Sequence, residues 1–173
     1  FEWEQEFSEN TTPSPYYPNS GIIYQLEEIG RSNVDDLPIY AVKLSYNVDQ
    51  NLDKPRVLIL GQCHAEEIYG VEIAMGIINM FLYPQDYDIA YRPTVNQINP
   101  YAHLREALAE TEIWVIPTHN PEGLQVVYGE YIENGEVIHD VSFRKNITDT
   151  NGNGVLDYQN YSNHNMYAGG EID

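Results

Sequence analysis

The chain has 173 residues, of which 27 are acidic and 8 are basic, and its net charge is −19. A surface this acidic repels nucleic acid and anionic membranes, so we exclude both as partners, and no apolar run approaches the roughly 20 residues that a membrane span needs. The apolar fraction of 42% is typical of a globular domain, and the lone cysteine, Cys63, excludes an internal disulfide framework.

The first part of the chain combines an irregular start with strand patterns. Residues 1–20 are acidic and then rich in Pro, Ser and Asn, which indicates an extended arm. Residues 22–29 fit a strand or a short helix, and residues 37–46 show the partial alternation of a strand. Residues 56–60 (RVLIL) are a continuous apolar run before Gly61, which predicts a buried central strand.

Helical and strand patterns alternate in the rest of the chain. Apolar residues at three- and four-residue spacing predict a helix over 66–83, and Pro100 fits the first turn of a second helix over 101–110. Residues 113–116 (IWVI) read as another buried strand, and 126–132 and 136–141 flank a predicted hairpin turn at Glu133-Asn134-Gly135. This alternation predicts an α/β fold for residues 21–173, in which 148–173 form an Asn- and Gly-rich loop.

The most informative motif is Gly61-Gln62-Cys63-His64-Ala65-Glu66-Glu67, at the junction of the buried strand and the first helix. Sites in α/β sheets form at the carboxyl ends of strands. An imidazole and a carboxylate three residues apart can converge on one cation, and zinc takes such ligands at about 2.0–2.2 Å. By itself the motif also fits an ordinary helix start, where the helix dipole favours acidic residues.

Further segments occur in the same order as in a known family. They are Ile29-Gly30-Arg31-Ser32, residues 37–45 (LPIYAVKLS), residues 54–61 (KPRVLILG), His64-Ala65-Glu66-Glu67, residues 117–123 (PTHNPEG) and Phe143-Arg144-Lys145-Asn146. Over about 120 residues this order resembles the opening of the zinc carboxypeptidase family, the funnelin-type metallocarboxypeptidases (peptidase M14). The resemblance implies a mixed β-sheet flanked by helices, incomplete in this chain.

The resemblance also implies roles for individual residues. His64 and Glu67 would be zinc ligands, and Arg144 would stabilise the tetrahedral oxyanion next to the zinc-activated water. The implied reaction is removal of C-terminal residues from a peptide or protein substrate. Glu66 departs from the family, which commonly has a substrate-binding Arg at this position. Asn120, Pro121 and Gly123 are expected to shape a turn rather than to take part in chemistry.

Part of the family's catalytic set is not found in the sequence. No Asn-Arg pair follows Asn146, and the third ligand (a His), a Tyr and the general-base Glu are expected later than residue 173. None of the other histidines, His103, His119, His139 and His164, is expected to replace that ligand. We therefore expect the N-terminal half of an extracellular or secreted metallocarboxypeptidase, completed by the C-terminal remainder of the same precursor and inactive alone. The alternative is a non-catalytic structural or interaction module with the same fold.

A second metal site is predicted near the end of the chain. Asp149, Asn151, Asn153 and Asp157 place oxygen ligands at positions 1, 3, 5 and 9 of a loop with Gly154 at position 6. This is the first half of an EF-hand-like calcium loop. Asn160 stands at position 12 instead of the usual bidentate Glu, so a flexible polar turn is the alternative interpretation.

Overall fold

A computed structural model describes residues 16–84 and 102–144. The strands of the main sheet are β1 (Tyr24–Arg31), β2 (Pro38–Leu44), β3 (Arg56–Gln62) and β4 (Glu112–Thr118), in the order β1-β2-β4-β3. The helices are α1 (Tyr69–Leu82), α2 (Ala102–Glu110) and α3 (Pro121–Tyr128), and β5 (Tyr131–Glu133) and β6 (Glu136–Ile138) form a separate two-stranded sheet. The predicted α/β class is confirmed.

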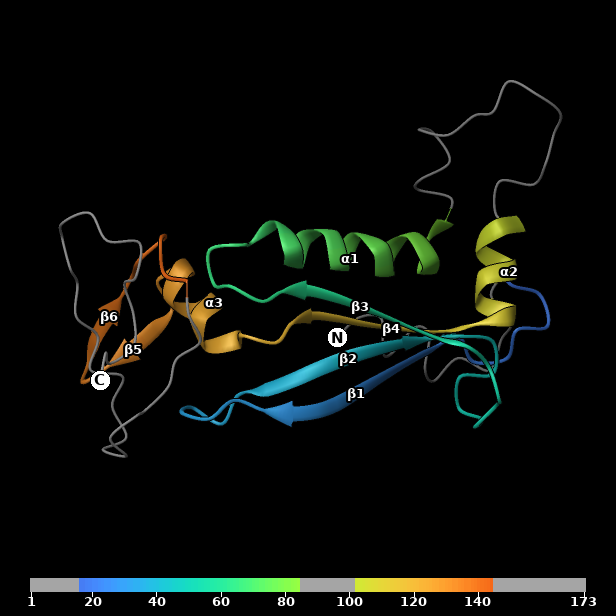
Figure 1. Cartoon of the computed structure of the whole chain (residues 1–173), viewed down its shortest axis with the longest axis horizontal. Coiled ribbons are helices and arrows are strands. Elements are labelled where there is room, and N and C mark those ends of the chain that lie inside the picture. Colours follow the sequence, from blue (N-terminus) through green and yellow to red (C-terminus); the bar gives the residue numbers. More distant parts are fainter. Residues whose placement is uncertain (1–15, 85–101, 145–173) are drawn as a thin grey trace, which may run out of the picture. The chain divides into compact units, whose positions relative to one another are not determined.

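The main sheet is mixed. Strands β2 and β4 are antiparallel, with Val42 opposite Val115, whereas β3 and β4 point the same way in Figure 1. The chain crosses between β3 and β4 through α1 and α2. Among the described residues no helix has the length and hydrophobicity required to cross a membrane.

The chain divides into two compact units, and the first comprises residues 1–27, 41–59 and 73–116. Its core combines strand residues with one face of α1, which buries Ala74, Ile78, Phe81 and Leu82. Figure 1 shows α1 lying along the strands. Tyr17, at the end of the expected arm, is fully buried and donates its hydroxyl hydrogen bond to the Phe81 carbonyl. Residues 1–15 of that arm lie outside the described residues.

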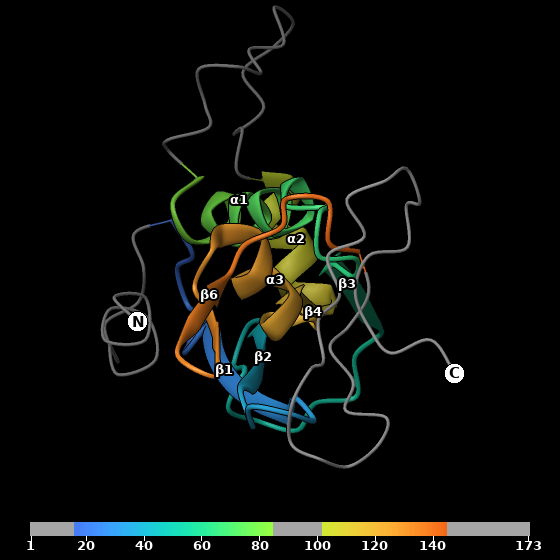
Figure 2. The same ribbon diagram turned by 90° about the vertical axis from the view of Figure 1, so that its left-hand side faces the viewer.

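The second unit comprises residues 28–40, 60–72 and 117–173, of which 145–173 lie outside the described residues. Its core consists of Ala65, Val126, Val127, Tyr131 and Phe143. Figures 1 and 2 show α3 beside the β5–β6 hairpin. The hairpin turn is confirmed: Asn134 and Gly135 both have positive φ angles, 52° and 82°, as a type I′ turn requires.

Three details of the sequence interpretation are wrong. The first helix begins at Tyr69 rather than at residue 66, because residues 64–68 form turns. Residues 126–128 belong to α3, which Asn120 caps, and not to a hairpin strand. Strand β3 lies at the edge of the sheet and exposes Leu58 and Leu60 (61% and 55%), so it is not a buried central strand within the described part of the chain.

Candidate metal centre

His64 and Glu67 lie in the turn between β3 and α1, within the second unit. Nδ1 of His64 is 2.9 Å from Oε1 of Glu67, and both side chains are about half exposed (41% and 47%). The backbone N–H of Glu67 donates to the His64 carbonyl at 3.0 Å, which closes the turn and brings the two side chains to the same side. The spacing predicted from the sequence therefore does place an imidazole nitrogen against a carboxylate oxygen.

A buried glutamine holds this turn in place through two side-chain hydrogen bonds. Gln62, the last residue of β3, is fully buried, and its Nε2 donates to the Ala65 carbonyl at 3.1 Å. Its Oε1 accepts a hydrogen bond from the hydroxyl of Thr118 at the end of β4. A buried side-chain amide whose N–H and carbonyl oxygen are both hydrogen-bonded stays in one orientation, because breaking either bond leaves a buried polar group without a partner. Sequence analysis overlooked Gln62, although a polar residue that ends an apolar strand was a usable signal.

Asn120 ties the same turn to the start of α3. Its Oδ1 accepts from the Gly123 N–H at 3.1 Å as a helix N-cap, and its Nδ2 donates to the Cys63 carbonyl at 3.1 Å. The side chain is 3% exposed. Asn120, Pro121 and Gly123 were expected to shape a turn, but they form the N-cap and first turn of α3, and Asn120 adds a direct link to Cys63, the residue before His64.

Two glycines allow the backbone to pass closely at this point. A Cβ on Gly61 would lie 2.2 Å from the Pro117 carbonyl oxygen, and one on Gly70 would lie 2.9 Å from the Gln62 nitrogen. Both clashes are with main-chain atoms, which cannot rotate away. Glycine at both positions therefore permits the close packing that positions the turn.

Arg144 joins the pair from a distant part of the sequence. Its carbonyl accepts from the Ala65 N–H at 3.0 Å, and the preceding Phe143 is fully buried in the core of the second unit. Its guanidinium forms an ion pair with Glu66, and Nη2 lies 3.4 Å from Nε2 of His64. The structure thus brings together Arg144, His64 and Glu67, the three residues that the resemblance singled out.

Two neighbours face the ring nitrogens of His64. A guanidinium is only a donor, so the contact from Arg144 Nη2 to Nε2 is a hydrogen bond in the tautomer that carries its proton on Nδ1, the nitrogen that faces Glu67. The hydrogen bond with His64 is the main cause that lowers the pKa of the Glu67 carboxyl, and the nearby positive charge of Arg144 adds to it. Metal binding through Nδ1 requires that this nitrogen carry no proton and that the Glu67 carboxylate be ionised.

The donor set fits zinc as a partial site. Two atoms 2.9 Å apart can both lie about 2.0–2.2 Å from one ion, and nitrogen with oxygen is a common zinc ligand combination. Within residues 16–84 and 102–144 no group of three His, Cys, Asp or Glu residues could hold a metal. His103 and His139 are exposed elsewhere, His119 is only half-buried and joins no such group, and His164 lies outside the described residues.

A sequence profile described as zinc carboxypeptidase matches residues 19–171. The chain belongs to the zinc carboxypeptidase family. Curated proteins include no significant match to it. The resemblance inferred from the ordered motifs is therefore confirmed over nearly the whole chain.

Solved structures agree with this carboxypeptidase fold. Thrombin activatable fibrinolysis inhibitor matches with a TM-score of 0.56 and 18% identity, over 88% of this chain and 29% of its own. Carboxypeptidase A from Helicoverpa armigera matches with a TM-score of 0.55 and 17% identity, over 87% of this chain and 27% of its own. At such identities the likeness shows the fold alone. The chain spans less than a third of the length of these structures.

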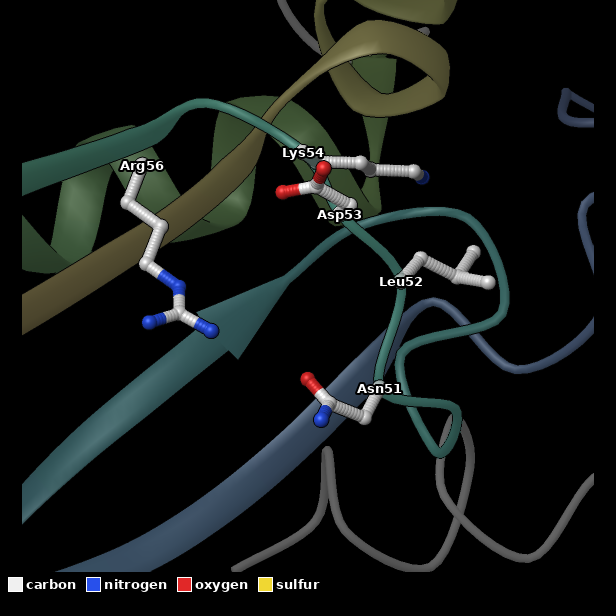
Figure 3. Close-up of a pocket in the computed structure, with 5 residues that line it drawn as sticks. All are labelled: Asn51, Leu52, Asp53, Lys54 and Arg56. Atoms are coloured by element: carbon white, nitrogen blue, oxygen red, sulfur yellow. The ribbon is translucent and has the colours of Figure 1, made fainter.

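Two other features remain, a predicted calcium site and a pocket. The calcium residues Asp149, Asn151, Asn153 and Asp157 lie outside the described residues, so that site stays a prediction. An open pocket of about 470 Å³ lies in the first unit, before and at the start of β3. Figure 3 shows its lining residues, Asn51, Leu52, Asp53, Lys54 and Arg56. None of them is a histidine, and none belongs to the unit that contains His64.

Proposed function

We propose that this chain is part of a zinc-dependent metallocarboxypeptidase that hydrolyses C-terminal residues from peptides. The observation that carries the proposal is the 2.9 Å approach of His64 Nδ1 to Glu67 Oε1, with Arg144 beside it, in a member of the zinc carboxypeptidase family. His64 and Glu67 are the proposed zinc ligands. When bound, zinc supplies an activated water and a polarised scissile carbonyl.

Arg144 is the proposed electrophilic partner in this reaction. An arginine guanidinium is a permanent cation with its donors fixed in one plane. Such a group stabilises negative charge that develops on the substrate carbonyl oxygen, and removing a comparable donor costs about 10²–10³ in kcat. Burial of Phe143 and the bond from Ala65 to the Arg144 carbonyl support this role, because they fix the backbone that carries the guanidinium.

The third ligand, the general base and the carboxylate-binding groups are proposed to come from the C-terminal remainder of the same precursor. Coverage of only 29% and 27% of the matched structures supports a longer functional protein. The edge position of β3 and its exposed Leu58 and Leu60 support pairing of a further strand along it, because a long apolar edge is otherwise prone to aggregation. A peptide or protein is the proposed substrate.

We also propose an extracellular location and a calcium ion at Asp149, Asn151, Asn153 and Asp157. The acidic composition, with a net charge of −19, supports both, since it suits a calcium-containing medium. Calorimetric titration with calcium tests the second proposal: Asp149→Ala should abolish a calcium-binding isotherm that the wild-type chain shows.

The enzymatic proposal is tested on the full-length precursor loaded with zinc. Peptide products are followed by mass spectrometry for stepwise loss of C-terminal residues. We expect activity in the wild type, none in His64→Ala, and a loss of about 10²-fold or more in kcat in Arg144→Gln. A full-length protein that is folded, contains zinc and releases no residue from any peptide would instead favour a non-catalytic module.

A further inference from the structure

Glu66 is the residue of the motif that departs from the family pattern, and its contacts give it a specific partner. Its Oε1 forms the ion pair with Nη1 of Arg144. Its Oε2 is buried and has no hydrogen-bond partner among the described residues. The ion pair with Arg144 is therefore what offsets the cost of removing this carboxylate from water.

The position of Arg144 creates an electrostatic conflict with cation binding. Its guanidinium lies 3.4 Å from His64 Nε2, and its Nη1 lies 3.7 Å from Oε1 of Glu67. A divalent cation held by His64 and Glu67 would meet this positive charge at close range.

Glu66 reduces this conflict without displacing Arg144. Because its Oε1 accepts from Nη1, it holds the guanidinium at the site, and its negative charge partly offsets the charge of Arg144 toward a cation at the pair, while Nη2 stays outside this ion pair. Glu66 is not itself a third ligand of the pair, since the described residues include no group of three that could hold a metal.

We infer that Glu66 is a positioning residue that holds Arg144 beside the His64–Glu67 pair and partly offsets its charge, so that the pair binds a divalent cation more tightly. This inference rests on the proposed function, because it takes His64 and Glu67 as the ligands. It gives a definite purpose to an acidic residue at a position where the family commonly has an arginine.

The test is a zinc titration of the chain followed by NMR of the His64 imidazole, assigned by comparison with His64→Ala. Glu66→Gln should weaken zinc binding roughly five- to tenfold, because it leaves the guanidinium uncompensated. Arg144→Gln should tighten binding, and the double variant should bind within about twofold of the wild type. The effect of Glu66→Gln should shrink in about 1 M salt, because both side chains are partly exposed.

Glu28→Gln is the matched control. Glu28 pairs with Arg31 at 2.7 Å on the surface of the same unit, so its replacement changes the net charge equally without touching the centre. It should change the zinc affinity less than twofold. If Glu66→Gln fails to fold, Arg144→Gln still tests the charge effect, because an Arg144→Gln affinity equal to that of the wild type would contradict the inference.

The outcomes separate the two proposals. Zinc that leaves the His64 signals unchanged in the wild type would contradict the proposed function and the inference together. Zinc that binds at His64 with equal affinity in the wild type, Glu66→Gln and Arg144→Gln would contradict the inference alone. Zinc binding that is weakened in Glu66→Gln and is not restored by adding Arg144→Gln would also overturn the inference, since loss of local structure would then be the cause.

Discussion

Replacing Gln62 with leucine should loosen the turn that carries His64 and Glu67. The substitution keeps a similar volume but removes two hydrogen bonds, one to the Ala65 carbonyl at 3.1 Å and one from the Thr118 hydroxyl. A net hydrogen bond contributes about 0.5–1.5 kcal/mol, and a stranded buried partner costs about 1–3 kcal/mol. Thr118 still accepts from the Asn120 N–H, but its own hydroxyl hydrogen loses its acceptor. Because Thr118 is only partly buried and Ala65 is fully buried, the Ala65 carbonyl is the more costly group to leave unpaired. The expected loss is therefore about 2–4 kcal/mol of unfolding free energy.

Urea denaturation measures this loss, and amide hydrogen exchange at residues 63–67 locates it. Gln50→Leu is the control, because Gln50 is exposed and its replacement should change the free energy of unfolding by less than about 0.5 kcal/mol. Zinc affinity at His64 should fall in Gln62→Leu and not in the control. An unfolding free energy for Gln62→Leu equal to that of the control would refute the assignment of Gln62 as the support of this turn.

Two further predictions follow, one for each compact unit. Burial raises the pKa of the Glu112 carboxyl, but hydrogen bonds from Trp114 and Lys43 more than offset it and hold the pKa below its ordinary value. The stabilisation from the ionised Glu112 carboxylate is thus complete above the unfolded pKa of about 4.3 and is lost as the pH falls through the folded pKa. The urea midpoints at pH 7 and pH 3 should therefore differ less in Glu112→Gln than in the wild type. An equal difference in the two proteins would contradict this assignment. Gly61→Ala places a Cβ 2.2 Å from the Pro117 carbonyl oxygen and should destabilise the chain by about 1–3 kcal/mol in thermal unfolding, whereas an unchanged Tm would show that the backbone can separate there.

Much of the secondary structure follows from local patterns, and its failures have physical causes. The Asn-Gly pair at 134–135 predicted the hairpin turn correctly because few residues adopt two successive positive φ angles. The run at 56–60 predicted a strand but not its edge position, which depends on the partners of β3. The helix start was placed too early because a long-range hydrogen bond from Asn120 to Cys63 and a local one from Gln62 to Ala65 hold residues 63–65 outside the helix.

The candidate centre was predictable to a similar extent. Spacing placed His64 near Glu67, and the ordered motifs brought in Arg144 from a distant segment. The ion pair between Glu66 and Arg144 was not predictable, because it joins residues 78 positions apart and depends on how the backbone of residue 144 docks against Ala65. The helix α3 was missed despite its signals, an Asn N-cap followed by Pro121 and the acidic Glu122.

X-ray absorption at the zinc edge of the zinc-loaded chain tests the central claim most directly, that His64 and Glu67 bind zinc together. Cys63 is an exposed free thiol next to His64 and is the natural competitor. The account predicts only nitrogen and oxygen ligands at about 2.0–2.2 Å, with an imidazole signal that disappears in His64→Ala. A zinc–sulfur distance of about 2.3 Å, or a spectrum unchanged by His64→Ala, would contradict it.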